Sequence, residues 1–232
     1  MKSRIANGLL ACLSRAQRQP LLAQCEQVDL AESTVLCEQG ERVRHVYFPI
    51  DSFISLITLI DAGSAFETGL VGSEGMQGIS LALGVAIAPQ RALVQGAGSA
   101  LRMPATAFRS ELAQNPSLRS VLDRYVHVLM CELAQTGACT RFHHIDARLA
   151  RWLLMSHDRS RGDEIHLTHE FLAYMLGVRR VGITTAASQL KARNLISYTR
   201  GMITVRDRAG LEAASCSCYR VGRDTYARVL AG

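Results

Sequence analysis

The spacing of apolar residues changes along the chain and predicts several structural zones. Residues 7–13 and 17–25 have the pattern of two short helices. From 33 to 83 short β-branched or aromatic runs alternate with turn residues, and further strands are expected at 91–95 and 99–103. No helix long enough for a parallel crossover interrupts these runs, so they predict a small antiparallel roll.

A long helix is expected after the roll. Following a short helix at 104–112, residues 117–138 carry an apolar stripe at three- and four-residue steps. The stripe consists of Leu118, Leu122, Tyr125, Leu129 and Leu133. The apolar surface is widened by Val121, Val126, Val128 and Met130, so the helix needs partners on more than one side. We predict that one side packs on the roll and that the stripe forms a homodimer interface; the alternative is that it packs only within its own chain.

The segment LTHEFLAYMLGVRRVGITTAASQLKARNLI, residues 167–196, predicts two helices joined by a sharp turn. Thr168 is suited to cap the first helix, and Gly177 can adopt the left-handed conformation that ends it. The second helix, over 179–194, carries Ile183 and Leu190 on the side expected to be buried. The pattern is that of a helix-turn-helix.

The opposite side of this second helix carries residue types that read DNA bases. Arginine pairs bidentately with guanine, and threonine bonds either kind of base or touches the thymine methyl. The predicted groove-facing residues are Arg179, Arg180, Thr184, Thr185 and Ser188. Two short strands at 195–198 and 202–206 then predict a wing with Arg200 at its tip, and we expect Thr168, Lys191 and Arg200 to contact phosphates.

Charge is distributed unevenly along the 232 residues. Residues 1–140 contain 11 Lys and Arg against 12 Asp and Glu, whereas residues 141–232 contain 15 against 8. A neutral body with a basic C-terminal part favours a polyanionic partner, although a solvated basic surface alone would give the same count. The chain has neither an apolar stretch of membrane-spanning length nor a signal-like start, and its seven cysteines are irregularly spaced. We therefore expect a cytoplasmic protein with no membrane association.

In the order of its elements the chain resembles the Crp/Fnr family of bacterial transcription regulators. The residues that carry the resemblance are GERVRHVYFP, VGSEGMQG, CTRFHHIDARLARWLLMSHDR, LTHEFLAYMLGVRR, LISYTRGMI and CSCY. The resemblance implies an α+β fold: an N-terminal antiparallel β-roll of the cyclic-nucleotide-binding type over 1–116, a dimerisation helix over 117–142, and a winged helix-turn-helix over 143–232. It also implies a homodimer on a two-fold DNA operator, with RNA polymerase and an unknown small-molecule effector as further candidate partners.

The chain departs from this family at two sites. On the recognition helix, Arg180 matches the family's first arginine, but Val181 and Thr185 replace its acid and second arginine, so the operator sequence should differ. In the roll, Glu74 and Arg91 are the nearest candidates for an effector site, and they are separated too widely for the family's cyclic-phosphate motif. The N-terminal cysteine group of iron–sulfur members is also missing. We expect no cyclic nucleotide, haem or iron–sulfur cofactor.

Two other chemistries compete with DNA binding. A metal or thiol site could be formed by Cys139, His143, His144, Cys216 and Cys218. Zinc sites usually show tighter paired spacing such as C-x-x-C, so we predict that these residues serve packing and bind no metal. A roll can also be a cupin-like metalloenzyme with an accessory helical domain. That alternative needs clustered histidine and acid ligands among the strands, but His45 is the one histidine expected there. The sequence also contains no known catalytic motif. We therefore predict that the protein is not an enzyme.

Overall fold

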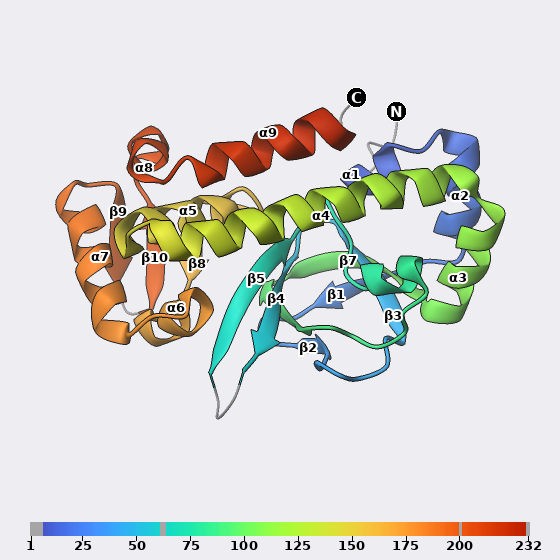
Figure 1. Ribbon diagram of the computed structural model, residues 1–232, viewed down its shortest axis with the longest axis horizontal. Coiled ribbons are helices and arrows are strands. Elements are labelled where there is room, and N and C mark those ends of the chain that lie inside the picture. The colour runs from blue at the N-terminus through green and yellow to red at the C-terminus, as the bar shows by residue number, and fades with distance from the viewer. Residues whose placement is uncertain (1–6, 61–63, 200, 231–232) are drawn as a thin grey trace.

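A long helix, α4 (Pro116–Phe142), runs along most of the molecule and connects a β-roll to a smaller helical domain (Figure 1). The computed structural model describes residues 7–60, 64–199 and 201–230. Within these ranges helices and antiparallel sheets alternate as the sequence predicts, so the α+β fold class is confirmed. No helix in the described part is both long and apolar enough to cross a bilayer.

The roll consists of two antiparallel sheets that enclose an apolar core. One sheet has the strand order β1-β7-β3 and the other β2-β6-β4-β5. The strands are β1 (Glu26–Leu30), β2 (Val35–Cys37), β3 (His45–Pro49), β4 (Phe53–Leu59), β5 (Ala65–Val71), β6 (Arg91–Gly96) and β7 (Gly98–Pro104), with a 3₁₀ helix, η2 (Ile79–Leu83), between β5 and β6.

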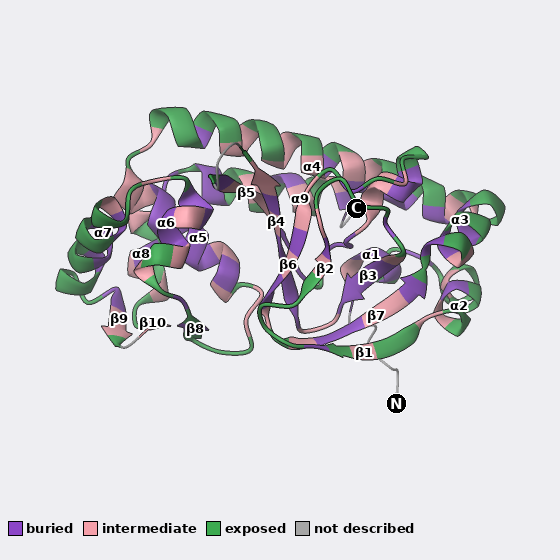
Figure 2. Ribbon diagram, turned by 90° about the horizontal axis from the view of Figure 1, so that it is seen from below, coloured by how far each residue is buried: buried purple, intermediate pink, exposed green. Residues whose placement is uncertain are grey.

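Three short helices close the roll at the end away from the helical domain (Figure 1): α1 (Gly8–Ala11), α2 (Arg15–Ala23) and α3 (Ala105–Gln114). Ser14 and Gln17 form a reciprocal capping box at the start of α2, which satisfies two amides that the helix leaves free. The core of the roll includes Phe48, Ile54 and Phe108, all nearly inaccessible to solvent, and its buried strands are seen in Figure 2.

The helical domain surrounds a second, separate core. Its helices are α5 (Ile145–His157), α6 (His169–Leu176), α7 (Arg180–Ala192) and α8 (Arg208–Ala214), and its sheet has the order β8-β10-β9, with β8 (Glu164–His166), β9 (Ile196–Thr199) and β10 (Met202–Val205). Glu164 and Ile165 end a polar run, SRGDEI, that has the composition of a loop. In the structure both residues belong to β8, because they pair with β10 and Ile165 enters the core.

The last helix, α9 (Cys218–Leu230), turns back from the helical domain and lies along α4 (Figure 1). Its terminal Leu230 is buried in the core of the roll, and Tyr226 and Val229 pack against that core. The predicted C-terminal domain begins at residue 143 and includes α9. In the structure, however, the end of α9 packs in the core of the N-terminal roll.

Candidate DNA-binding interface

The first helix of the helix-turn-helix, α6, begins and ends as the sequence predicts. The hydroxyl of Thr168 accepts a hydrogen bond of 3.1 Å from the backbone N–H of Phe171, which satisfies one free amide of α6. Gly177 ends α6 in the left-handed conformation, with φ 61° and ψ 42°. A side chain at this position would be strained, and its Cβ would lie 3.1 Å from Phe66 of the roll. The corner therefore depends on glycine for two reasons.

One side of α7 is buried and fixes the helix in place. Ile183, Ala186, Ala187 and Leu190 are all buried in the core of the helical domain. Gly182, which lowers helix propensity, is explained by the same packing. A Cβ on Gly182 would lie 2.9 Å from Cδ1 of Ile145 in α5, so the missing side chain lets α7 approach α5 closely.

The other side of α7 is open to solvent at the end of the molecule farthest from the roll (Figure 1). All six predicted DNA contacts on this helix are exposed: Arg179, Arg180, Thr184, Thr185, Ser188 and Lys191. Val181, beside them, is 69% exposed. An exposed row that begins at the helix N-terminus and contains two arginines has the geometry of a recognition helix in the major groove.

The hydroxyls in this row already have hydrogen-bond acceptors. Thr184 donates to the carbonyl of Arg180 at 3.1 Å, and Ser188 donates to the carbonyl of Thr184 at 2.8 Å. Thr185 donates in the same way to Val181 at 3.0 Å. With their protons on these carbonyls, the oxygens can still accept from the amino groups of cytosine and adenine.

His169 connects the recognition helix to the wing. Its ring stacks on Tyr198 of β9 with centroids 4.3 Å apart, and its Nδ1 lies 3.2 Å from the hydroxyl of Thr184. Burial, and then the positive charge of Arg180, lower the pKa of His169. The neutral ring thus ties β9 to α7. Sequence patterns did not single out His169, because its partners are 15 and 29 residues away. Arg200, the predicted wing contact, lies outside the described residues.

The DNA-binding domain is docked on the roll. The indole N–H of Trp152 donates to Glu67 of β5 at 2.6 Å, and Arg159 pairs with Glu74 at 2.6 Å. Met175 of α6 packs with Ile57 of β4 in a small apolar cluster between the two domains. These contacts fix α6, and through it α7, relative to the roll.

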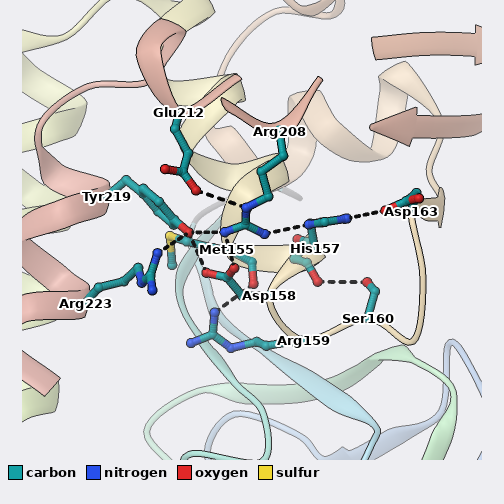
Figure 3. A network of polar contacts seen from close by, with 11 residues as sticks. Met155, His157, Asp158, Arg159, Ser160, Asp163, Arg208, Glu212, Tyr219 and Arg223 are labelled. Carbon is teal, nitrogen blue, oxygen red and sulfur yellow. Dashed lines mark hydrogen bonds and ion pairs between the residues drawn. The ribbon is translucent and has the colours of Figure 1, made fainter. Parts of the chain in front are cut away.

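A polar network holds the C-terminal helices to the end of α5 (Figure 3). Arg208 of α8 donates to Asp158 and to the hydroxyl of Tyr219 in α9, both at 2.5 Å. The Tyr219 hydroxyl in turn donates to the other oxygen of Asp158 at 2.9 Å. Asp158 is followed directly by Arg159, which pairs with the roll, so α5, α8, α9 and the roll are linked through two adjacent side chains.

The predicted dimer stripe on α4 requires correction. Leu118, Leu122 and Tyr125 are at most 2% exposed and belong to the core of their own roll, so these three residues are not available to a second subunit. Leu129 is half-buried against that core, and Leu133 remains 47% exposed. The periodicity identified a packed face correctly but could not say which partner covers it.

The two effector candidates do not form a common site. Glu74 accepts from Arg159, while Arg91, at the start of β6, pairs with Glu38 at 2.7 Å. A cavity of about 860 Å³ between α4, α5 and α9 is bordered by Glu74 but not by Arg91. Because each charge is neutralised by its own partner, the structure does not support a joint role in binding a phosphate.

Four of the five cysteine and histidine residues that could gather into a metal or thiol site do lie together, and His144 is not among them. Cys139, His143, Cys216 and Cys218 place their ligand atoms within 4.8 Å of one another. They meet because two stretches that are far apart along the chain, 139–143 and 216–218, converge where α9 begins. Among the described residues this is the one such group of three or more potential metal ligands, and none lies among the strands of the roll. The cupin-like alternative is therefore not favoured.

Comparison with known proteins agrees with this geometry. Residues 147–214 match the sequence family of the Crp-like helix-turn-helix domain. A search of curated protein sequences found no match. The fold and the exposed recognition helix define a winged helix-turn-helix DNA-binding protein built on a β-roll.

Solved structures give the wider relationship. A protein of Eubacterium rectale ATCC 33656 described as a transcriptional regulator of the Crp/Fnr family is 17% identical, with a TM-score of 0.71 over 91% of this chain and 99% of that one. A transcriptional regulator of the CRP family from Thermus thermophilus is 18% identical, with a TM-score of 0.66 over 81% and 96%. The c-di-GMP-responsive global regulator CLP of Xanthomonas campestris is 15% identical, with a TM-score of 0.65 over 83% and 99%. The chain thus contains a Crp-like helix-turn-helix domain and has the fold of these regulators.

Proposed function

We propose that the protein is a homodimeric, sequence-specific DNA-binding transcription regulator that acts in the cytoplasm and catalyses no reaction. The observation that carries this proposal is the exposed row on α7, which begins with Arg179 and Arg180 in a Crp-like helix-turn-helix domain. The apolar side of the same helix is buried, so the polar side is held out rigidly for a partner.

Each residue of the row has a proposed role. Arg179 and Arg180 lie at the helix N-terminus, where side chains reach base edges, and guanine is their preferred base. Thr184, Thr185 and Ser188 accept from base amino groups, and Val181 contacts a thymine methyl. Thr168, Lys191 and Arg200 are proposed to contact phosphates, which fix the register on the duplex without reading sequence.

The dimer is proposed to form on the side of α4 that the roll leaves open. Met130 and Leu133 are 63% and 47% exposed and are neighbours on one side of the helix. They lie on one stripe with the half-buried Val126 and with Gly137, at steps of four, three and four residues. Two such stripes packed about a two-fold axis would place the recognition helices in successive major grooves, about 34 Å apart.

The effector of this regulator is proposed to differ from a cyclic phosphate held at Glu74 and Arg91. CLP responds to c-di-GMP, and recognition of a phosphate needs a cation that is free to pair with it. In this chain Arg91 and Arg159 are both engaged by carboxylates of the roll. A ligand at either arginine would first have to break an ion pair.

The proposal is tested by selecting binding sites from random DNA with the full-length protein. The expected result is a two-fold sequence motif whose half-sites are one helical turn apart. The affinity for that motif should fall steeply with salt, because lysine and arginine release counterions from the phosphates. Equal enrichment of all sequences, or no retained DNA at low salt, would refute sequence-specific binding.

A further inference from the structure

Four potential metal ligands meet where the long helix ends. Cys139 lies in the last turn of α4, His143 follows that helix directly, and Cys216 and Cys218 stand at the start of α9. The Sγ atoms of Cys139 and Cys216 are 3.5 Å apart, and Nδ1 of His143 is 3.4 Å from Sγ of Cys218. All four ligand atoms lie within 4.8 Å of one another.

These separations match a mononuclear tetrahedral site. With metal–sulfur and metal–nitrogen bonds of about 2.3 and 2.0 Å, two sulfurs should be about 3.8 Å apart and a sulfur and a nitrogen about 3.5 Å apart. The group is therefore close to the geometry of bound zinc before any metal is added. Three thiolates and one imidazole are also an established ligand set for structural zinc.

The local backbone explains how the closely spaced pairs Cys139–His143 and Cys216–Cys218 can each supply two ligands to one site. Cys139 and His143 are four residues apart, and the N–H of His143 still donates to the carbonyl of Cys139 at 3.1 Å, so both side chains project from one side of α4. Cys216 and Cys218 are two residues apart in a segment that is not helical until Cys218, and the exposed Ser217 between them points elsewhere. Each pair supplies two ligands from one direction.

The surroundings favour negative charge at the four residues. Cys139, Cys216 and Cys218 are at most 8% exposed, and Arg148 and Arg151 of α5 are buried beside them. Within the described residues neither arginine has a carboxylate at ion-pair distance, whereas buried cations normally have one. Thiolates around a metal would provide the missing negative charge.

One further contact supports a sulfur ligand. The side-chain amide of Gln135 donates to Sγ of Cys218 at 2.9 Å, as partners behind a metal ligand do.

We propose that Cys139, His143, Cys216 and Cys218 bind one Zn²⁺ ion per chain as a structural site. The ion would join the end of α4, the link between α4 and α5, and the start of α9. It would therefore fix the DNA-binding domain and the returning C-terminal helix to the long helix at one point. This inference does not depend on DNA binding, and its test needs no DNA.

The first experiment measures metal in the full-length protein, purified under reducing conditions without chelators. Mass spectrometry of the elements should find one zinc per chain. The variant Cys216→Ser/Cys218→Ser should contain almost none, whereas the control Cys25→Ser/Cys131→Ser, which changes two cysteines outside the group, should keep it. Zinc-free native protein that also takes up no added Zn²⁺ would overturn the proposal.

A second measurement avoids the risk that a ligand variant fails to fold. Native protein stripped of zinc and loaded with Co²⁺ should show the absorption of a tetrahedral thiolate complex and a thiolate-to-cobalt charge-transfer band. His143→Cys should keep the ion and strengthen that band, while His143→Ala should bind it more weakly. A Cys139–Cys216 disulfide that persists in protein purified under reducing conditions, an iron–sulfur spectrum, or a cobalt spectrum without thiolate character would each refute the zinc site.

Discussion

The indole N–H of Trp152 in α5 donates a 2.6 Å hydrogen bond to the carboxyl group of Glu67 in β5. This contact joins the DNA-binding domain to the roll, and Ser55 donates to the other oxygen of Glu67 at 2.6 Å. Burial raises the pKa of Glu67 from 4.5 to about 7, although both hydrogen bonds and the nearby Arg159 and Arg151 oppose the shift. The interdomain contact is therefore sensitive to pH.

The first prediction concerns the pH dependence of stability. Because the pKa of Glu67 is higher in the folded state, its contribution is most favourable below pH 4.5 and is lost as the pH rises through about 7. Removing the charge with Glu67→Gln should raise the free energy of unfolding at pH 8 by up to about 3 kcal/mol, with little change at pH 5. Denaturant unfolding followed by fluorescence of Trp152, the single tryptophan of the chain, measures both values. A variant less stable than the native protein at pH 8 would contradict it.

The second prediction concerns the recognition helix. Arg180→Ala should weaken binding to the selected operator by about 1–3 kcal/mol and relax the preference at one base pair of each half-site. Arg109→Ala, which removes an exposed arginine from α3 on the roll, serves as the matched control and should bind like the native protein. Fluorescence anisotropy against the operator and against single-base variants gives both quantities. Equal losses of affinity for the two variants would show that Arg180 does not contact a base.

The third prediction separates the two sides of α4. Met130→Glu/Leu133→Glu should produce folded monomers, because these side chains are exposed in the single chain and charge would oppose their burial in a dimer. Leu122→Ala should instead destabilise the fold by about 2–5 kcal/mol, because Leu122 lies within the roll's core. Light scattering and thermal unfolding distinguish the outcomes. A persistent dimer in the first variant would place the interface elsewhere.

The fourth prediction uses two glycines whose substitution should have opposite effects. Gly177→Ala should cost about 1–2 kcal/mol, because the position has φ 61° and a Cβ would press on Phe66. Gly222→Ala, in the interior of α9 with no atom near the new Cβ, should stabilise the protein by up to about 1 kcal/mol. Chemical unfolding of the two variants tests both signs, and a stabilising Gly177→Ala would mean that the corner can rearrange.

Local sequence patterns predicted the helix-turn-helix well. Each of these three features is local: the Thr168 cap, the Gly177 corner and the buried side of α7. Each depends on interactions or spacings of four residues or fewer. Helix periodicity and capping are properties of short segments, so they can be read without knowing the fold. Exposure of Arg180 does not follow from this periodicity, because Arg180 lies three residues before Ile183 and seven before Ala187, on nearly the same side of the helix. Arg180 is exposed because it is the first residue of α7, beyond the part of the helix that packs on the core.

The remaining features required the tertiary structure. Periodicity marked α4 as apolar on several sides, but it could not say that Leu122 meets its own roll while Met130 stays exposed, since both choices bury the same kind of side chain. The pairing of Trp152 with Glu67 spans 85 residues, and that of Cys139 with Cys216 spans 77. Spacing along a chain carries no information about such pairs. The sequence by itself thus determined most of the elements and the helix-turn-helix. The tertiary structure decided how α5 and α6 meet the roll, and it brought Cys139, His143, Cys216 and Cys218 together at the start of α9.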